Sequence, residues 1–182
     1  MRRVQVLKVG RAERSSALKL CARELASEML GVSIEHLRVA YQMPSGRPVL
    51  MMGDTESAAR LSFSHLDDRV AVAIDDEHSV GIDLVRTQDA QALVAWMPKA
   101  DSDSRQGPQY AAHIWAAREA AFKAAAIDRP FRPDHFQIRW TGGQTFCWSV
   151  DESGSTVAGD GHFELRDALI CAIAYRRARI NG

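Results

Sequence analysis

With 182 residues, 46% of them hydrophobic, the chain is long enough to bury a sizeable core as one domain or as two small domains in tandem. Its 23 acidic and 23 basic residues balance, which excludes a global charge preference for nucleic acid or for an anionic membrane surface. A basic pocket confined to one site remains compatible with this balance.

Three cysteines, Cys21, Cys147 and Cys171, lie far apart and form no pair with metal-ligand spacing, which predicts reduced thiols in the core. The first eight residues alternate apolar and polar side chains, unlike a signal peptide, and no later run is long enough to cross a bilayer. We therefore expect a cytoplasmic protein whose partners include neither a membrane nor nucleic acid.

In the first part of the chain, apolar residues recur at helical spacing over residues 14–30, and Gly31 provides a helix stop. Alternating or β-branched segments predict strands over residues 37–43, 59–64 and 69–75. These elements predict one helix packed against a small antiparallel sheet.

The acidic turn at residues 75–78 predicts a boundary, because the pattern starts again after it. We expect a strand over 79–85, a short helix over 89–96, a polar loop over 98–108 and a longer helix over 109–126, followed by strands at 136–140, 144–150, 161–165 and 169–175. The chain therefore predicts two α+β halves, residues 1–77 and 78–182.

The segment Trp115-Ala-Ala-Arg118-Glu119-Ala-Ala-Phe-Lys123 places Trp115, Glu119 and Lys123 four residues apart, on one face of the longer helix. An exposed Glu-Lys pair of this spacing is common on helices. A carboxylate beside an ammonium on a partly apolar face is also suited to bind a metal phosphate. If the Glu-Lys pair were simply exposed, the apolar side chain of Trp115 would lie on a charged face. Both interpretations stay open.

An acid, Asp83, interrupts the apolar strand Val80-Gly81-Ile82-Asp83-Leu84-Val85. A carboxylate there must be paired, metal-bound or at the strand end, because burying it alone is strongly unfavourable. A salt-bridged or turn-capping aspartate fits this pattern as well as a functional one does.

Two further segments are weak signals when taken singly. Ser64-His65 ends a predicted strand, and Gly46-Arg47-Pro48 forms a turn; each usually marks only a hydrogen-bonded turn. A Ser64/His65/Asp83 triad is disfavoured, because adjacent strand residues point to opposite faces.

In this order, the four segments resemble the Sfp-type family of 4′-phosphopantetheinyl transferases. The family pattern is a Gly-Lys-Pro-like turn, a strand ending in Ser-His, then (V/I)-G-(I/V)-D and, further on, W-x-x-K-E-x-x-x-K. The resemblance covers residues 14–123, with a looser match in the closing strands.

This resemblance implies an α+β fold that is a pseudo-dimer of two similar halves, monomeric as a chain, with the active site in the cleft between them. It implies a magnesium-dependent enzyme that transfers the 4′-phosphopantetheine group of coenzyme A to a serine of an apo acyl or peptidyl carrier protein and releases 3′,5′-ADP. Such carriers serve fatty acid, polyketide or nonribosomal peptide biosynthesis.

The resemblance also implies a role for each matching residue. Asp83 and Glu119 hold Mg²⁺, for which carboxylate oxygens are suitable hard ligands. Glu119, directly or through a water, is the base for the carrier serine, and Lys123 neutralises the pyrophosphate. Ser64 and His65 contact coenzyme A phosphates, while Arg47 lies beside the nucleotide.

Several positions depart from the family pattern. Val85 stands where many bacterial members have a third acid, so a water is expected in place of that ligand. Residues 86–113 are short and polar where the family usually carries apolar helices that receive the carrier protein. The N-terminal region offers only Arg11 and Arg14 as candidates for the 3′-phosphate of coenzyme A.

The altered segment motivates an alternative, a non-catalytic coenzyme A-binding or scaffold protein that keeps the transferase fold. A further alternative is a metal-dependent hydrolase of small pyrophosphates that uses the same two carboxylates.

Overall fold

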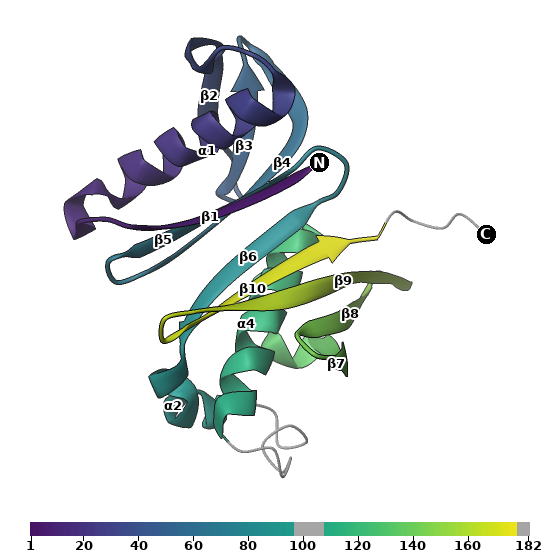
Figure 1. Cartoon of the computed structure of the whole chain (residues 1–182). Helices are drawn as coiled ribbons and strands as arrows, with labels where there is room; N and C mark the ends of the chain where they lie inside the picture. Colours follow the sequence, from purple (N-terminus) through teal and green to yellow (C-terminus); the bar gives the residue numbers. More distant parts are fainter. Residues whose placement is uncertain (97–107, 178–182) are drawn as a thin grey trace.

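The computed structural model describes residues 1–96 and 108–177 and contains two five-stranded antiparallel sheets with helices packed against them (Figure 1). The predicted α+β class is confirmed. Most of the loop expected over residues 98–108 lies outside the described residues.

The first half forms a sheet of order β1-β5-β4-β3-β2 and one long helix. In chain order its elements are β1 (Arg2–Lys8), η1 (Arg11–Glu13), α1 (Arg14–Leu30), η2 (Ile34–His36), β2 (Leu37–Gln42), β3 (Arg47–Met52), β4 (Thr55–Leu66) and β5 (Arg69–Asp75). Helix α1 has the predicted bounds and ends at Gly31 in the left-handed conformation, which favours glycine.

The second half repeats this arrangement with a sheet of order β6-β10-β9-β8-β7. Its elements are β6 (Val80–Arg86), η3 (Thr87–Asp89), α2 (Ala90–Val94), α4 (Pro108–Ala125), η4 (Pro133–His135), β7 (Phe136–Gly142), β8 (Thr145–Glu152), β9 (Ser155–Arg166) and β10 (Leu169–Arg176). Strand by strand, β6 corresponds to β1, β10 to β5 and β9 to β4, and α4 takes the place of α1.

Each long helix covers one face of its own sheet. In the first half, Leu18, Cys21 and Leu25 of α1 pack against the buried side chains of Leu50, Val70, Val72 and Ile74. In the second half, α4 presents mainly alanines to the sheet. Small side chains let the helix backbone approach the strands closely.

Helix α4 approaches its sheet closely at Gly81 of β6. A Cβ built on Gly81 would lie 1.9 Å from the carbonyl oxygen of Ala120 and 2.7 Å from the amide nitrogen of Ala124. Because these atoms belong to the helix backbone, a side chain at position 81 would push α4 away from β6. The glycine between two apolar residues of this strand therefore sets the spacing between β6 and α4.

We predict that Gly81→Ala destabilises the protein by about 2–3 kcal/mol, because overpacking a dense core forces the backbone to shift. Chemical denaturation at constant pH measures the change. Gly154→Ala is a control for loss of glycine where the added Cβ meets no atom, although its φ of 80° adds strain of its own. Equal stability of Gly81→Ala and the parent protein would contradict the close contact.

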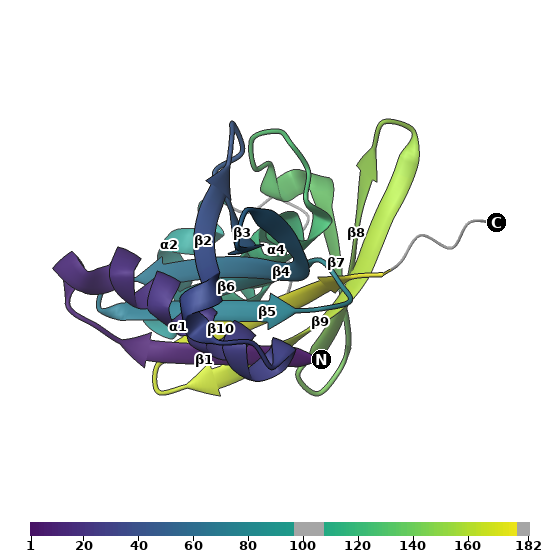
Figure 2. The same cartoon turned by 90° about the horizontal axis from the view of Figure 1, so that it is seen from above.

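The two halves meet through strands that are buried on both faces. Val70, Val72 and Ile74 of β5 face α1, whereas Ala71 and Ala73 face the second half. On β6, the alternate residues Val80, Ile82 and Leu84 face the first half. The two orthogonal views show β4 and β5 beside β6 and β10 (Figures 1 and 2). The opposite face of β6, which carries Asp83, is therefore turned toward α4.

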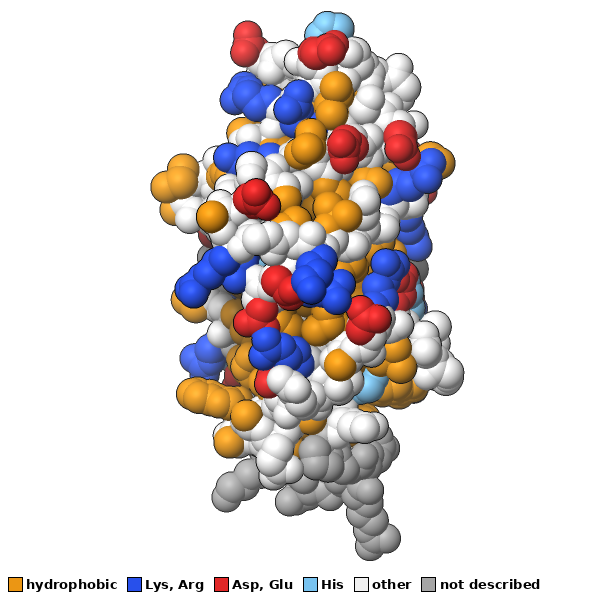
Figure 3. Space-filling model, turned by 60° about the vertical axis from the view of Figure 1, so that its left-hand side comes forward, with side chains coloured by type: hydrophobic (Ala, Val, Ile, Leu, Met, Phe, Trp, Pro, Cys, Tyr) orange, Lys and Arg blue, Asp and Glu red, His pale blue; other side chains and the backbone are white. Residues whose placement is uncertain are grey.

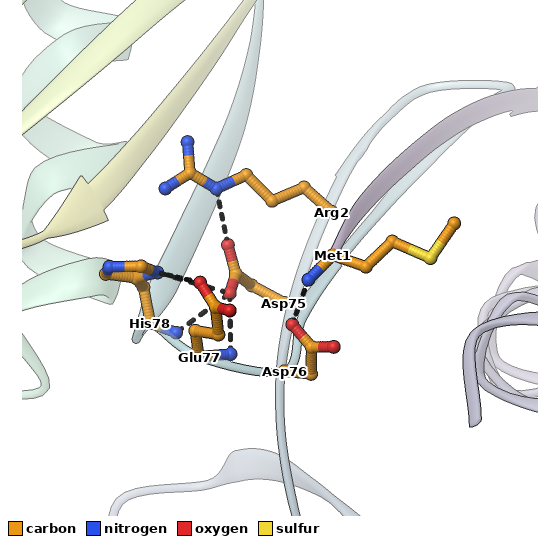
Figure 4. A network of polar contacts seen from close by, with 6 residues as sticks. All are labelled: Met1, Arg2, Asp75, Asp76, Glu77 and His78. Carbon is orange, nitrogen blue, oxygen red and sulfur yellow. Dashed lines mark hydrogen bonds and ion pairs between the residues drawn. The ribbon is translucent and has the colours of Figure 1, made fainter.

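A buried carboxylate, Asp75, fixes the short link between the halves (Figure 4). It accepts hydrogen bonds from Arg2 Nε at 2.7 Å and from the amides of Glu77 and His78 at 2.8 Å each. The Arg2 guanidinium also lies 4.0 Å from the ring centroid of Tyr175, in the second half. Arg2, at the start of β1, and Asp75, at the end of β5, thus connect this end of the first sheet to β10.

Basic and acidic side chains are interspersed on the face shown in Figure 3, in keeping with the equal numbers of the two. Ion pairs Arg69–Asp167 and Arg86–Asp67 join the hairpin turns of the two halves. All three cysteines are free, and burial raises the pKa of Cys21 to about 11 and of Cys171 to about 12. Cys147 is only partly buried, so the expectation that all three lie in the core is wrong for this residue.

Candidate functional site

A pocket of about 470 Å³ opens where β4 and β6 meet α2 and α4. It brings together six residues that the sequence singled out: Ser64 and His65 of β4, Asp83 of β6, and Trp115, Glu119 and Lys123 of α4. These residues come from both halves of the chain, so the pocket exists only because the halves are packed together.

Asp83 is the buried centre of this pocket, with 4% of its surface exposed. Its Oδ1 atom accepts hydrogen bonds from Lys123 Nζ at 2.9 Å and from Ser64 Oγ at 3.0 Å. Its Oδ2 atom is also buried and meets no backbone, hydroxyl or cationic donor among the described residues, while the Glu119 carboxyl hydrogen-bonds to Asp83. A buried carboxylate oxygen without a donor is unfavourable, so Oδ2 is available to a ligand.

Serines of β4 hold the adjacent strand β6 in place. Ser62 Oγ accepts a hydrogen bond from the amide of Ile82 at 3.0 Å, and Ser64 Oγ accepts one from the amide of Leu84 at 3.2 Å. Because β6 is an edge strand of its sheet, these hydroxyls satisfy amides that lack a strand partner on that side. Ser64 differs from Ser62 in that its own hydroxyl hydrogen goes to Asp83.

This difference makes the two serines a matched pair for mutation. We predict that Ser62→Ala and Ser64→Ala each lower stability by about 1–3 kcal/mol, because each leaves a buried amide without an acceptor. Only Ser64→Ala should also weaken the binding of a divalent cation at Asp83, by roughly tenfold, because Asp83 loses a donor that orients it. Denaturation and calorimetry measure the two effects; equal loss of binding in both variants would contradict the positioning role of Ser64.

Glu119 lies one helical turn before Lys123 and faces Asp83. Burial, together with the negative charge and hydrogen bonding of Asp83, raises the pKa of Glu119 to about 7, although the positive charge of Lys123 opposes the shift. Lys123 is held by Asp83 and by the carbonyl oxygen of Ile82, at 2.8 Å. Two neighbouring carboxyls thus lie beside a single ammonium, and the group carries excess negative charge once Glu119 is ionised.

Trp115, the third residue on this helix face, contributes more than the packing expected of it. Its ring meets Phe131 edge to face at 5.9 Å, and its side chain also hydrogen-bonds to Glu119, which lowers the pKa of that carboxyl. An indole N–H is a donor only, so this contact favours the ionised form of Glu119.

The donor set fits a hard divalent cation such as Mg²⁺. Asp83 Oδ2 and the Glu119 carboxyl are oxygen ligands, and bound cations of this kind keep several waters. Within residues 1–96 and 108–177, no group of three or more His, Cys, Asp or Glu side chains has an arrangement that could hold a metal. Asp83 and Glu119 are therefore the two candidate ligands; Asp89 also lines the pocket but does not complete a group of three, and Val85 lines the pocket where the resemblance would place a third acid.

A second pocket, of about 550 Å³, adjoins the first, and Phe63 and Lys123 line both. Arg47 lines this second pocket, and its Nη2 donates to the carbonyl oxygen of Ile127, just beyond the end of α4, at 3.0 Å. Tyr41, Pro48 and Phe122 contribute flat or apolar surface. Only Gly46 lies in the turn before β3; Arg47 and Pro48, expected in the turn, begin the strand, and they lie beside α4 although some 70 residues separate them from Glu119 in the chain.

Some expected residues do not take the expected place. His65 lines the first pocket but is exposed, and as the neighbour of Ser64 on β4 it faces the opposite side of the strand, so Ser64, His65 and Asp83 do not form a triad. Arg118 is buried and donates to the carbonyl oxygen of Phe136 at 3.0 Å, so it supports β7 rather than the pockets. Neither Arg11 nor Arg14 lines either pocket.

Two pocket residues were not foreseen. Asp89, at the start of α2, lines the first pocket; in the sequence it is only an acid that opens a short helix. Arg129 lines the second pocket; in the sequence it belongs to a helix-ending Asp-Arg-Pro turn. No local pattern distinguishes either residue from ordinary turn residues.

No helix among the described residues is long and apolar enough to cross a membrane. Neither the models of known protein families nor the curated proteins with which the chain was compared match it.

Proposed function

We propose that the protein is a magnesium-dependent 4′-phosphopantetheinyl transferase that modifies a serine of an apo acyl or peptidyl carrier protein. The observation that carries this proposal is the pairing of Asp83 and Glu119 in a pocket between the halves, with Asp83 Oδ2 buried and without a backbone, hydroxyl or cationic donor within the described residues. When Glu119 is ionised, the excess negative charge of the two buried carboxylates favours a cation at this place.

The repeated topology supports the same proposal. Both sheets have the same strand order, each with a long helix on one face, and this matches the pseudo-dimer that the resemblance implies. The candidate carboxylates both come from the second half, while Ser64 and Arg47 come from the first.

Each pocket residue has a role that its contacts suit. Magnesium, when bound, neutralises the diphosphate of coenzyme A and the charge that develops as the phosphorus–oxygen bond breaks. Lys123 lies between the two pockets, where its ammonium neutralises a phosphate oxygen of the same diphosphate. Glu119, with a pKa raised by burial to about 7, is matched to accept the proton of the attacking serine hydroxyl near neutral pH.

The second pocket suits the nucleotide part of coenzyme A. Tyr41, Phe63 and Phe122 offer apolar surface to an adenine, and Arg47 adds positive charge. Since Lys123 lines both pockets, a ligand that spans them places its diphosphate beside the two carboxylates.

The direct test mixes the protein with coenzyme A, Mg²⁺ and a panel of apo acyl and peptidyl carrier proteins, and measures the mass of each carrier. Addition of one phosphopantetheinyl group to at least one carrier is the expected result. Failure to modify any carrier would refute the proposal. If coenzyme A then still bound in a magnesium-dependent way, the protein would be a non-catalytic binder, whereas 3′,5′-ADP released without a carrier would indicate a hydrolase.

A further inference from the structure

The first pocket contains an acid, Asp89, to which the proposed chemistry gives no role. Asp89 is partly buried and is the last residue of η3, directly before α2. It is the third carboxylate, after Asp83 and Glu119, among the described residues that line this pocket. Because Asp83 and Glu119 lie on β6 and α4, Asp89 approaches the pocket from a different element.

The helix that follows Asp89 does not use its carboxylate. An aspartate directly before a helix usually has an extended backbone and accepts a hydrogen bond from an amide of the first turn. Asp89 instead has helical backbone angles, with φ at −79° and ψ at −4°, and makes no side-chain capping hydrogen bond. It also forms no ion pair with any residue of 1–96 or 108–177. Its oxygens are therefore available as acceptors to a ligand in the pocket.

The backbone on both sides of Asp89 is anchored. Thr87 donates two hydrogen bonds to the carbonyl oxygen of Ala168, from its amide at 3.0 Å and from its Oγ1 at 3.2 Å. Ala90, the first residue of α2, is buried in the core of the second half. Asp89 is thus held at a fixed place in the pocket wall, as a residue that orients a ligand must be.

The arrangement suits a cation that Asp89 contacts only through water. In the described part of the chain, no three His, Cys, Asp or Glu side chains are arranged to hold a metal together, although three acids line this pocket. A magnesium ion bound by few carboxylates keeps several waters, and these waters donate hydrogen bonds. Val85 and Leu93, which line the same pocket, offer them no acceptor.

From this arrangement we infer that Asp89 accepts hydrogen bonds from the waters of a magnesium ion held by Asp83 and Glu119, and so is an outer-sphere positioning residue. This inference rests on the cation site of the proposed function. Asp83 Oδ2, buried and without a backbone, hydroxyl or cationic donor among the described residues, is the direct contact. Asp89 acts through water, and such outer-shell partners strengthen and orient a bound metal.

The test compares Asp89→Asn with the parent protein by calorimetry, with neither coenzyme A nor a carrier present. The Kd for Mg²⁺ should rise roughly tenfold in the variant. Hexaamminecobalt(III) is the second probe, because its ammonia ligands do not exchange and a protein can contact it only through them; its binding should weaken by a similar factor. Asp134→Asn is the matched control, since Asp134 also belongs to a short 3-10 helix, is 51% exposed and lines neither pocket.

A third measurement distinguishes contact through water from direct ligation. Water-proton relaxation with Mn²⁺ in place of Mg²⁺ counts the waters on the bound cation. The count should be the same in Asp89→Asn and in the parent protein, because Asp89 is not itself a ligand. An additional water in the variant would overturn the inference, as would unchanged binding of hexaamminecobalt(III) or a parent protein that binds neither Mg²⁺ nor this complex.

These outcomes separate the inference from the transferase proposal. If Asp83→Asn loses Mg²⁺ binding and Asp89→Asn keeps it, the role of Asp89 is refuted while the cation site remains. If Mg²⁺ binding depends on Asp89 in a protein that modifies no carrier, the inference holds and only the transferase is refuted.

Discussion

Asp83→Asn is expected to lower the rate of phosphopantetheinyl transfer by roughly a thousandfold or more while leaving the protein folded. The substitution keeps the size of the side chain, and an amide oxygen can still accept from Ser64 and Lys123 as Asp83 Oδ1 does. What it removes is the negative charge and the free Oδ2 atom that would bind the cation. Loss of activity without loss of structure is therefore the signature of a ligand position.

Three measurements distinguish the loss of a metal ligand in Asp83→Asn from a loss of folding. Transfer is followed by the mass of the carrier, cation binding by calorimetry of Mg²⁺ with coenzyme A, and folding by the denaturation midpoint. Asp54→Asn is the control, because Asp54 is an exposed turn residue that lines neither candidate pocket. An Asp83→Asn protein with near-normal transfer would refute the assignment of Asp83 as a metal ligand.

Local patterns were enough to predict the elements that carry the site. The stripe of Ile114, Ala117, Ala121 and Ala124 predicted α4 to within a residue at each end, since helical periodicity depends only on neighbours along the chain. The placement of Glu119 and Lys123 on one face followed from the same spacing. Strand alternation likewise put Asp83 on the side of β6 opposite to Ile82 and Leu84.

Elements that depend on partners elsewhere in the chain were missed or shortened. The segment of β1 alternates, but β1 is a strand because it pairs with β5, some seventy residues away. β3 carries Pro48 and then a continuous apolar run without alternation, so it lacked a strand signal. β4 and β9, with 12 residues each, were predicted too short because their first residues are polar or glycine.

In the site, too, local patterns predicted single residues but not the contacts between residues that are distant in the sequence. The sequence indicated Ser64 and Asp83 separately, but the hydrogen bond between them depends on how β4 crosses the edge of β6. Arg47 reaches the Ile127 carbonyl across 80 residues of sequence, a contact that no local pattern contains. Arg129 was interpreted only as part of a helix stop, although the fold places it in the wall of a pocket.

Glu119→Gln is expected to abolish most of the transfer activity yet to stabilise the cation-free protein at pH 8. Burial and Asp83 raise the pKa of Glu119 from 4.5 to about 7, so the folded state holds a proton that the unfolded state releases at lower pH. Between about pH 4.5 and 7 the folded state binds more protons, and the free energy of unfolding therefore falls as the pH rises. The full difference corresponds to roughly 3 kcal/mol above pH 7, because each pKa unit is worth about 1.4 kcal/mol.

Glutamine resembles the protonated glutamate, so the variant and the parent protein should be equally stable near pH 4.5, and the variant should be the more stable at pH 8. Denaturation at several pH values with a chelator present measures this, and Glu28→Gln, at a residue that is 62% exposed, provides the control. Added Mg²⁺ should raise the free energy of unfolding of the parent protein at pH 8, because a cation between the carboxylates stabilises the ionised form of Glu119. It should change the free energy of unfolding of the variant little. A parent protein whose stability is independent of pH from 5 to 8 and insensitive to Mg²⁺ would show that Glu119 does not share its site with Asp83, and would remove the physical basis for a cation there.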